Sequence, residues 1–412
     1  MPLPIDPAFQ MTFEARIAAL AALSESSEHL VRPAFTPSMK RVNALMSEWM
    51  TAAGMVTRED AIGNLIGRYE GDKPNAPALM IGSHLDTVID AGRYDGALGV
   101  LLGLAVVEHL HAAGQRLPFA VEVIAFCDEE GLRFHLPYLG SRAVNGTLTA
   151  AQLAMVDDSG VSVADALRSF GGSPDDLASA ARRPDELLAY LEAHIEQGPA
   201  LEAADEPLGV VTAIAGQYRG QLTFIGEAGH AGTVPMRLRR DALVAAARFV
   251  AQVYEHAAAV EGLVATVGQM NVQPGASNAI PGRVTLSLDV RHAEDTLREQ
   301  ATADLRRIAQ QIAAASRCAL DWLDISTTPA VACSPRLVDV LSAAIASERA
   351  PLRMVSGAGH DAAQMARIAP MAMLFVRCKG GLSHHPEEFC AAADAEAALH
   401  ALLGAVWALA SP

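Results

Sequence analysis

The chain has 412 residues and a formal net charge of −16, with 51% hydrophobic and 19% charged residues. At about 150 residues per domain this length predicts two or three domains, and the hydrophobic content excludes a disordered protein. The negative charge has the wrong sign for coating nucleic acid or an anionic membrane surface. We therefore expect a small-molecule partner, with no nucleic acid and no membrane partner.

Cysteine usage and the N-terminal stretch indicate the compartment. The cysteines show no C-x-x-C spacing, and an odd number in a long chain is untypical of a disulfide framework. They are Cys127, Cys318, Cys333, Cys378 and Cys390. Residues 1–20 lack a basic segment followed by an apolar one and a cleavage site. We therefore expect a cytoplasmic enzyme.

The first half of the chain alternates helices with strands. Apolar residues recur at helical spacing from about Phe13 to Ala53, before a predicted strand at Asn64–Tyr69. A buried strand at Ala78–Ile81 precedes a helix at about Asp95–Ala113, and a further strand is predicted at Phe119–Cys127. This order predicts an α/β domain with a largely parallel sheet flanked by helices.

The pattern changes between about Val211 and Pro329. Strands and helices are predicted there in the order β-α-β-β-α-β, which is typical of a ferredoxin-like α+β unit. They are Gln221–Ile225, Asp241–Ala258, Val264–Val267, Arg283–Val290, Thr296–Ala315 and Ala319–Leu323. A helix at Ser334–Ile345 and a strand at Met371–Arg377 then return to the first pattern. The sequence thus predicts one domain formed by residues 1–211 and 330–412, and an inserted domain formed by residues 212–329.

Acidic and histidine residues follow predicted strands, at the sheet edge where open α/β sheets bind ligands. His84 and Asp86 come directly after Ala78–Ile81. Because they are two positions apart, Asp86 could accept a hydrogen bond from the far ring nitrogen of His84 and orient it toward a metal. A structural role explains this pair equally well. Asp95 opens the predicted helix, where a carboxylate is equally explained as an N-cap.

Further candidates lie at other strand and helix ends. The adjacent carboxylates of Glu129 and Glu130 repel each other and are costly to desolvate unless cations or solvent compensate them. A solvated loop is the alternative interpretation. His194 follows a helical stretch that is predicted from about Asp185, and His384 lies in a loop after a strand. Singly, these histidines are more often structural.

Taken together, these side chains are the ligand types of a two-ion centre with a bridging carboxylate. The sequence lacks the competing signatures Gly-x-Ser-x-Gly, Gly-x-x-x-x-Gly-Lys-Ser/Thr and Gly-x-Gly-x-x-Gly. The pattern therefore favours a metal centre over a serine hydrolase or a nucleotide-binding site.

Nine segments carry a family resemblance. GSHLDT, GRYDGALGV, FCDEEGLRF, HIEQGPALE, GHAGTVPM, SNAIPG, DVRH, GAGHDA and GLSHHPEEF occur in the order found in two-metal hydrolases related to aminoacylase. Within this metallopeptidase family the chain resembles the branch of allantoate amidohydrolase, N-carbamoyl-L-amino-acid hydrolase (the hydantoinase/carbamoylase enzymes) and β-ureidopropionase. The resemblance implies a catalytic di-metal domain in residues 1–211 and 330–412, a lid and dimerisation domain in residues 212–329, and a homodimer.

The resemblance also implies a role for individual residues. His84 and His194 would bind on one side of the centre and Glu130 and His384 on the other, with Asp95 bridging two ions of zinc, manganese or cobalt. His385 could exchange with His384, because relatives commonly have another residue at that position. Glu129 would be the general base, although spacing alone does not distinguish it from Glu130.

Further implied residues bind the substrate or support the ligands. His230 would stabilise the oxyanion from a partner subunit, and Gln197 would contact the ureido end. Asn278 and Arg291 would hold the substrate carboxylate, with a surface salt bridge as the alternative for Arg291. Asp86 and His360 would support the ligands, and hinges near Val211–Thr212 and Pro329 would let the inserted domain close.

The implied activity is hydrolysis of the ureido C–N bond of a small carboxylate, by a hydrolase of linear amides and amidines. The substrate would be allantoate or an N-carbamoyl-L-amino acid, and FCDEEGLRF followed by GSRAVNG resembles allantoate enzymes. The sequence does not separate these from β-ureidopropionate. The alternatives are a dipeptidase or N-acyl-amino-acid deacylase on the same scaffold and, in another class, a non-catalytic small-molecule binding protein.

Overall fold

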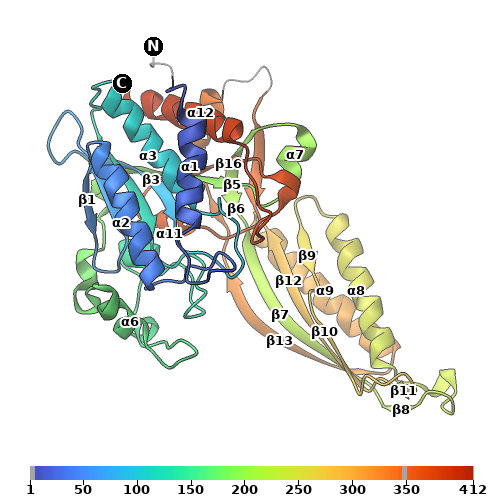
Figure 1. The fold of residues 1–412 in the computed structure, drawn as a ribbon. Coiled ribbons are helices and arrows are strands. Elements are labelled where there is room, and N and C mark those ends of the chain that lie inside the picture. Colours follow the sequence, from blue (N-terminus) through green and yellow to red (C-terminus); the bar gives the residue numbers. More distant parts are fainter. Residues whose placement is uncertain (1–4, 346–349, 412) are drawn as a thin grey trace. The chain divides into compact units, whose positions relative to one another are not determined.

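The computed structural model describes residues 5–345 and 350–411. The chain divides into two compact units. The first contains Met1–Thr212 and Cys333–Pro412, and the second contains Ala213–Ala332. Each unit has its own sheet and its own helices (Figure 1).

The larger sheet has nine strands in the order β1-β2-β4-β3-β5-β16-β6-β14, with β15 paired to β6. All of it belongs to the first unit except β14 and the last two residues of β6. The strands are β1 Val56–Glu59, β2 Leu65–Tyr69, β3 Ala78–His84, β4 Ala120–Phe126, β5 Leu187–Ile195, β6 Leu208–Ile214, β14 Val331–Ala332, β15 Leu352–Ser356 and β16 Met371–Val376. The central strands β4, β3, β5 and β16 run parallel to one another, whereas β1, β2, β6 and β14 pair antiparallel. This confirms the predicted α/β fold with a largely parallel central sheet.

The central strands are buried because their sequences are nearly continuous apolar runs. Every residue of β3, β4 and β16 is buried, as expected for strands that are covered on both faces. The larger helices of this unit are α1 Phe9–Ala21, α2 Pro37–Ala52, α3 Ala97–Ala112, α10 Pro335–Ala344 and α12 Ala392–Ala410. Helices α1, α3 and α12 pack side by side (Figure 1).

Helix α3 approaches the sheet closely at Gly99. A Cβ atom there would lie 2.2 Å from the carbonyl oxygen of Ala193 and 3.0 Å from Cβ of Ser83. Such distances exclude a side chain unless the backbone moves. Only glycine therefore allows α3 to pack against β3 and β5 at this height.

Helix α12 is unusually long and apolar. By length and composition alone it is apolar enough to cross a membrane, and 56% of it is buried inside the structure. It packs against α1, α3 and α10. A core helix of a folded domain passes the same test of length and composition.

The second unit contains an antiparallel sheet in the order β10-β12-β7-β13, with β9 paired to β12. Its strands are β7 Gly216–Ile225, β9 Val264–Thr266, β10 Met270–Gln273, β12 Arg283–His292 and β13 Ala319–Thr328. Helices α8 Ala242–Ala258 and α9 Asp295–Ala315 pack on this sheet, and burial along β12 alternates strictly. The predicted β-α-β-β-α-β order is present, with the additional strand β10 and a small ribbon of β8 Gly229–His230 and β11 Ala279–Ile280.

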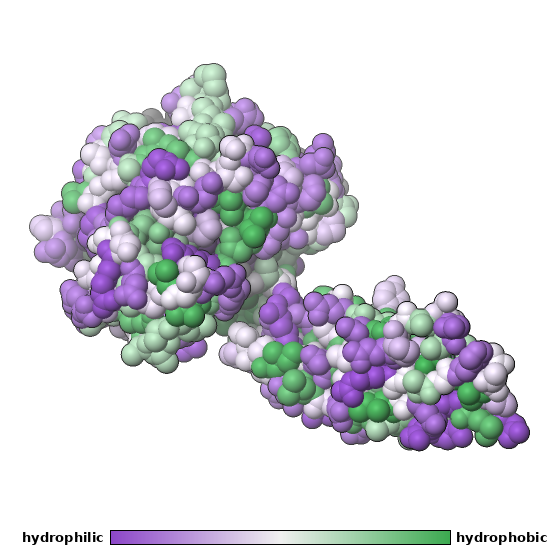
Figure 2. Space-filling model, turned by 60° about the horizontal axis from the view of Figure 1, so that its bottom comes forward, coloured by the Kyte–Doolittle hydropathy of each residue, from purple (hydrophilic) through white to green (hydrophobic). Residues whose placement is uncertain are grey.

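The surface of the second unit carries several exposed hydrophobic side chains. Tyr254 is 77% exposed, Met236 is 73% exposed and Leu323 is 59% exposed. On the face shown in Figure 2, hydrophobic side chains lie among hydrophilic ones over this unit.

One predicted element is wrong. The stretch from about Asp185 to His194 was expected to be helical, but Leu187–Ile195 forms β5 at the centre of the sheet. Leucine, alanine and glutamate are good helix formers, but this intrinsic preference is small, and burial between two parallel neighbours, β3 and β16, overrides it. His194 consequently projects from a strand.

Candidate metal centre

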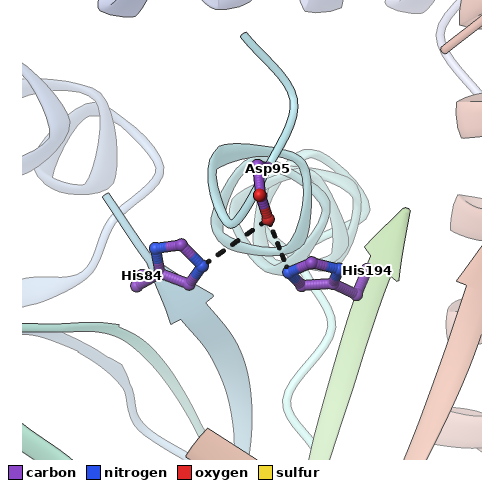
Figure 3. A group of neighbouring side chains, drawn as sticks. All are labelled: His84, Asp95 and His194. Atoms are coloured by element: carbon purple, nitrogen blue, oxygen red, sulfur yellow. Dashed lines mark ion pairs between the residues drawn. The ribbon is translucent and has the colours of Figure 1, made fainter. Parts of the chain in front are cut away.

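Two histidines from neighbouring parallel strands converge on one aspartate. His84 is the last residue of β3, and His194 lies one residue before the end of β5. Nε2 of His194 is 3.0 Å from Oδ1 of Asp95, and Nε2 of His84 is 3.8 Å from the same oxygen. Figure 3 shows both rings pointing toward this carboxylate, and all three side chains are buried.

The second oxygen of Asp95 faces a different pair of side chains. Oδ2 lies 3.1 Å from Nε2 of His384, which in turn lies 3.6 Å from Oε1 of Glu130. The ligand atoms of Asp95, Glu130 and His384 lie within 4.8 Å of one another, as do those of His84, Asp95 and His194. Asp95 is therefore shared by two groups, each of which could hold a metal ion.

Asp95 is not used as a helix cap. Helix α3 begins at Ala97, its N-cap is Gly96, and no side chain makes a capping hydrogen bond there. The alternative interpretation of this carboxylate, as an N-cap, is therefore wrong.

Glu129 borders the same cluster. Its Oε2 atom is 4.0 Å from Nε2 of His84, and its ligand atoms also group with those of His84 and Glu130. The geometry thus brings both adjacent glutamates to the centre, one residue apart in the chain.

Main-chain carbonyls orient the two buried histidines. Nδ1 of His84 lies 3.0 Å from the carbonyl oxygen of Asp86, and Nδ1 of His194 lies 2.9 Å from that of Ile195. In the neutral form of each ring, Nδ1–H donates to its carbonyl and the lone pair is on Nε2, which faces Asp95. This is the tautomer that a metal ligand requires. In the protonated form Nε2 also carries a proton, which His194 donates to Asp95.

The expected contact between Asp86 and His84 is therefore only partly correct. The Asp86 carboxylate is 3.7 Å from Nδ1 of His84, beyond normal hydrogen-bond length. Its two oxygens instead accept from the backbone amides of Glu129 and Glu130, at 3.1 Å each. Asp86 thus holds the main chain of the glutamate pair.

Burial and neighbouring groups shift the pKa values of the three carboxyl groups in the cluster. Burial raises the pKa of Asp95, but hydrogen bonds from His194 and His384 outweigh it and hold the pKa well below its usual value. Burial raises the pKa of Glu129 well above its usual value, with the charge of Glu130 adding to the effect. Burial, and then Asp95, raise the pKa of Glu130 to about 7.

The donor set fits divalent cations. Among the described residues, no Lys or Arg forms an ion pair with Asp95, Glu129 or Glu130; their ion-pair partners are histidines. Buried carboxylates are costly without compensating charge. Carboxylate oxygens and imidazole nitrogens are ligands that suit zinc and manganese.

Gln197 and Ser383 contact the aspartate as well. Nε2 of Gln197 donates to Oδ2 of Asp95 at 3.1 Å and to Oγ of Ser383 at 3.0 Å. Ser383 and Glu388 were not among the predicted site residues, although both lie in the quoted segment GLSHHPEEF. His385 is exposed, and its Nδ1 accepts from the amide of Glu387 at 3.2 Å.

His360 lies beside His194 in a buried polar cluster. The two rings meet edge to face with centroids 4.5 Å apart, and Nε2 of His360 is 2.8 Å from Oγ of Ser356. The neighbouring carboxylate of Glu192 accepts hydrogen bonds from Ser83, Tyr190 and the amide of Ala362. Glu192 was not predicted from the sequence as part of the site. The contacts of Glu192 span three segments that are distant in the sequence.

The remaining predicted residues lie in the second unit. His230 on β8 pairs with Ala279 on β11, and the carbonyl of Asn278 accepts from the amide of Ala231. The structure therefore brings His230 and Asn278 together. Figure 1 shows this ribbon beyond the Arg283 end of β12.

Arg291 lies toward the opposite end of β12. The eight residue-to-residue steps from Arg283 to Arg291 span about 26 Å at roughly 3.3 Å per step. Its guanidinium donates to both oxygens of Asp289, at 2.8 and 3.1 Å. The salt bridge considered as an alternative for Arg291 is thus present, with Asp289 as its partner.

Comparison with known proteins assigns the family. The profile of peptidase family M20/M25/M40 matches residues 80–408. The chain is 41% identical to "Probable allantoate deiminase" of Oryza sativa subsp. japonica, over 90% of this chain and 83% of the relative. It is also 41% identical to "N-carbamoyl-L-amino acid amidohydrolase" of Geobacillus stearothermophilus, over 94% of this chain and 95% of the relative.

A solved structure agrees with these relatives. An amidase of the hydantoinase/carbamoylase family from Burkholderia multivorans superimposes with a TM-score of 0.92 and 34% identity, over 98% of this chain and 99% of that chain. The fold and the clustered ligands are those of a metal-dependent hydrolase of C–N bonds. The chain belongs to peptidase family M20/M25/M40.

Proposed function

We propose that this protein hydrolyses the ureido C–N bond of a small carboxylate, using two divalent cations held by His84, Asp95, Glu130, His194 and His384. The observation that carries this proposal is the division of the Asp95 carboxylate, with Oδ1 toward His84 and His194 and Oδ2 toward His384. Relatives named for hydrolysing allantoate and N-carbamoyl-L-amino acids support the substrate class.

The cations are zinc or manganese, with cobalt as a further candidate. A bound pair lowers the pKa of water and polarises the substrate carbonyl. The positive charge of two divalent cations exceeds the negative charge of Asp95 and Glu130. Bound cations would thus give a substrate anion a local positive partner in a protein whose net charge is −16.

Glu129 is the proposed general base. Its carboxylate is buried beside His84, and the amide of Glu129 is fixed by Asp86. It takes a proton from the attacking water and passes it to the leaving nitrogen. General-base catalysis of this kind contributes about 10²–10⁴-fold to the rate.

The second unit supplies the proposed oxyanion and carboxylate contacts. His230 and Asn278 lie together near the end of the sheet where β12 begins, at Arg283. Arg291 lies about 26 Å from Arg283 along the same strand. One compact substrate cannot bridge that separation. A substrate site that uses both groups therefore needs them from two subunits of a homodimer, with His230 and Asn278 from one and Arg291 from the other.

We propose that the second unit also forms the homodimer interface. Hinges near Val211–Thr212 and Pro329 would let this unit act as a lid. In this scheme Gln197 donates to Asp95 before substrate binds and contacts the ureido end of the substrate afterwards. We also propose that the enzyme is cytoplasmic.

The experiment is a substrate panel with added Mn²⁺. Ammonia and the released amine or acid are measured for allantoate, N-carbamoyl-L-amino acids, β-ureidopropionate, a dipeptide and an N-acetyl amino acid. We expect turnover of allantoate or an N-carbamoyl-L-amino acid. Turnover confined to the dipeptide or the N-acetyl substrate would replace the proposed activity with a dipeptidase or a deacylase. Protein that binds no Mn²⁺ and turns over none of these substrates would indicate a binding protein.

A further inference from the structure

Glu388 is a buried carboxylate that contacts the main chain of Asp95. It is 3% exposed. Its Oε1 atom accepts from the amide of Tyr94 at 2.8 Å and from the amide of Asp95 at 3.1 Å. Tyr94 and Asp95, which lie just before the N-cap of helix α3, are thus tied to a loop almost three hundred positions later in the chain.

Ser383 connects the two carboxylates. Its Oγ atom lies 3.1 Å from Oε2 of Glu388 and 3.2 Å from Oδ2 of Asp95. A hydroxyl has a single proton, so Ser383 donates to one of these oxygens at a time. Since Ser383 immediately precedes His384, this contact also ties the His384 backbone to Asp95.

The loop before Asp95 is shaped around the Glu388 carboxyl group. A Cβ atom at Gly92 would lie 2.1 Å from Cδ of Glu388 and 2.2 Å from its Oε1. Any side chain at this position would displace the carboxyl group from the Tyr94 and Asp95 amides. The close fit indicates that Glu388 and the loop are built to contact each other.

Glu388 also brings uncompensated negative charge to the centre. Across the described part of the chain, no Lys, Arg or His forms an ion pair with it, and its partners are two amides and a hydroxyl. Two carboxylates in contact with the same serine repel each other. Cations bound by Asp95 would relieve that repulsion.

We propose that Glu388 is a positioning residue for the shared aspartate. It fixes the Asp95 backbone so that the two carboxylate oxygens face different ligand groups, and its charge increases the affinity of the centre for divalent cations. This inference rests on the two-cation part of the proposed function. In this proposal Glu388 does not contact the substrate.

The test is Mn²⁺ binding to the full-length protein after chelation and removal of the chelator. Titration calorimetry on wild type, Glu388→Gln and Glu388→Ala gives the affinity and the stoichiometry. Loss of a partner that supports a metal ligand typically costs about 10–100-fold in affinity. We expect Glu388→Gln to weaken Mn²⁺ binding by about 10-fold, because the amide keeps an acceptor oxygen but loses the charge, and Glu388→Ala to weaken it further.

Asp241→Asn is the matched control. Asp241 also accepts from two consecutive backbone amides, those of Leu243 and Val244, but it caps α8 in the second unit. We expect this variant to bind Mn²⁺ as wild type does. Melting temperatures of the metal-free proteins check folding, and Glu388→Gln alone carries the test if Glu388→Ala does not fold.

Two outcomes overturn the inference. The first is Mn²⁺ affinity within twofold of wild type in both Glu388 variants. The second is an equal loss of affinity in Asp241→Asn, which would show a general effect on folding. Wild-type protein that binds no divalent cation would instead contradict the proposed function itself, so the two failures are distinguishable.

Discussion

His84 donates from Nδ1 to the main-chain carbonyl of Asp86 at 3.0 Å, while the Asp86 carboxylate lies 3.7 Å from the same nitrogen. The backbone therefore orients the imidazole. The carboxylate accepts from the amides of Glu129 and Glu130 instead. One residue thus connects the histidine at the end of β3 to the glutamate pair after β4, through different atoms.

This arrangement predicts the effect of Asp86→Asn. The amide side chain keeps one acceptor but places an NH₂ group against the backbone N–H of Glu129 or Glu130. We expect the turnover number to fall by about 10–100-fold, because the glutamate pair shifts while His84 keeps its carbonyl partner. Steady-state kinetics and cation content by mass spectrometry measure both effects. Wild-type turnover in this variant would contradict the role given to the carboxylate.

Glu129→Gln separates metal binding from catalysis. The variant keeps the size of the side chain and loses the ability to accept a proton. We expect it to retain the cations and to lose about 10²–10⁴-fold in turnover. Cation content and turnover are measured on the same preparation. A variant with normal activity would refute the assignment of the base, and one that loses a cation would make Glu129 a ligand.

His384→Ala and His385→Ala form a matched pair. Nε2 of His384 lies 3.1 Å from Asp95, whereas His385 is exposed with Nδ1 bonded to the Glu387 amide. We expect His384→Ala to lose one of the two cations and its activity, and His385→Ala to keep both. Equilibrium dialysis against Mn²⁺ gives the stoichiometry. The reverse result would assign the ligand to His385.

Removal of the cations should destabilise the first unit. A ligand that binds only the folded state stabilises it by about 2.7 kcal/mol at a free concentration one hundred times its dissociation constant. We therefore expect chelation to lower the melting temperature and abolish activity, and added Mn²⁺ to restore both. Differential scanning calorimetry with and without chelator is the measurement. An unchanged melting temperature and unchanged activity after verified metal removal would contradict a metal-dependent reaction.

The sequence predicts the convergence of ligand types because each residue follows a strand, and parallel strands end at one edge of a sheet. His84, Glu129 and Glu130 all follow this rule. His194 also lies at the end of a parallel strand, but the sequence does not predict that strand, because the composition of Leu187–Ile195 is typical of a helix and its burial between β3 and β16 makes it a strand. The family resemblance nevertheless implies His194 as a ligand, and the structure brings it together with His84 and Asp95.

Contacts between distant segments could not be predicted from the sequence. The hydrogen bond between the Asp95 amide and Glu388 joins residues 293 positions apart, and no local pattern indicates it. The same holds for Asp86, whose carboxylate accepts from amides rather than from the nearby imidazole. The pairing of Arg291 with Asp289 is local, and the alternation of β12 would have indicated it, since both side chains lie on one face of the strand.

Gly99 packs directly against Ser83 and Ala193, the residues that immediately precede His84 and His194. Any substituent on its α-carbon would push helix α3, and with it Asp95, away from both strands and from the two imidazoles. In a mutational scan for activity, replacements at Gly99 should therefore lower activity as much as replacements of the proposed metal ligands do. A position that takes part in no chemistry would then be mistaken for a functional one.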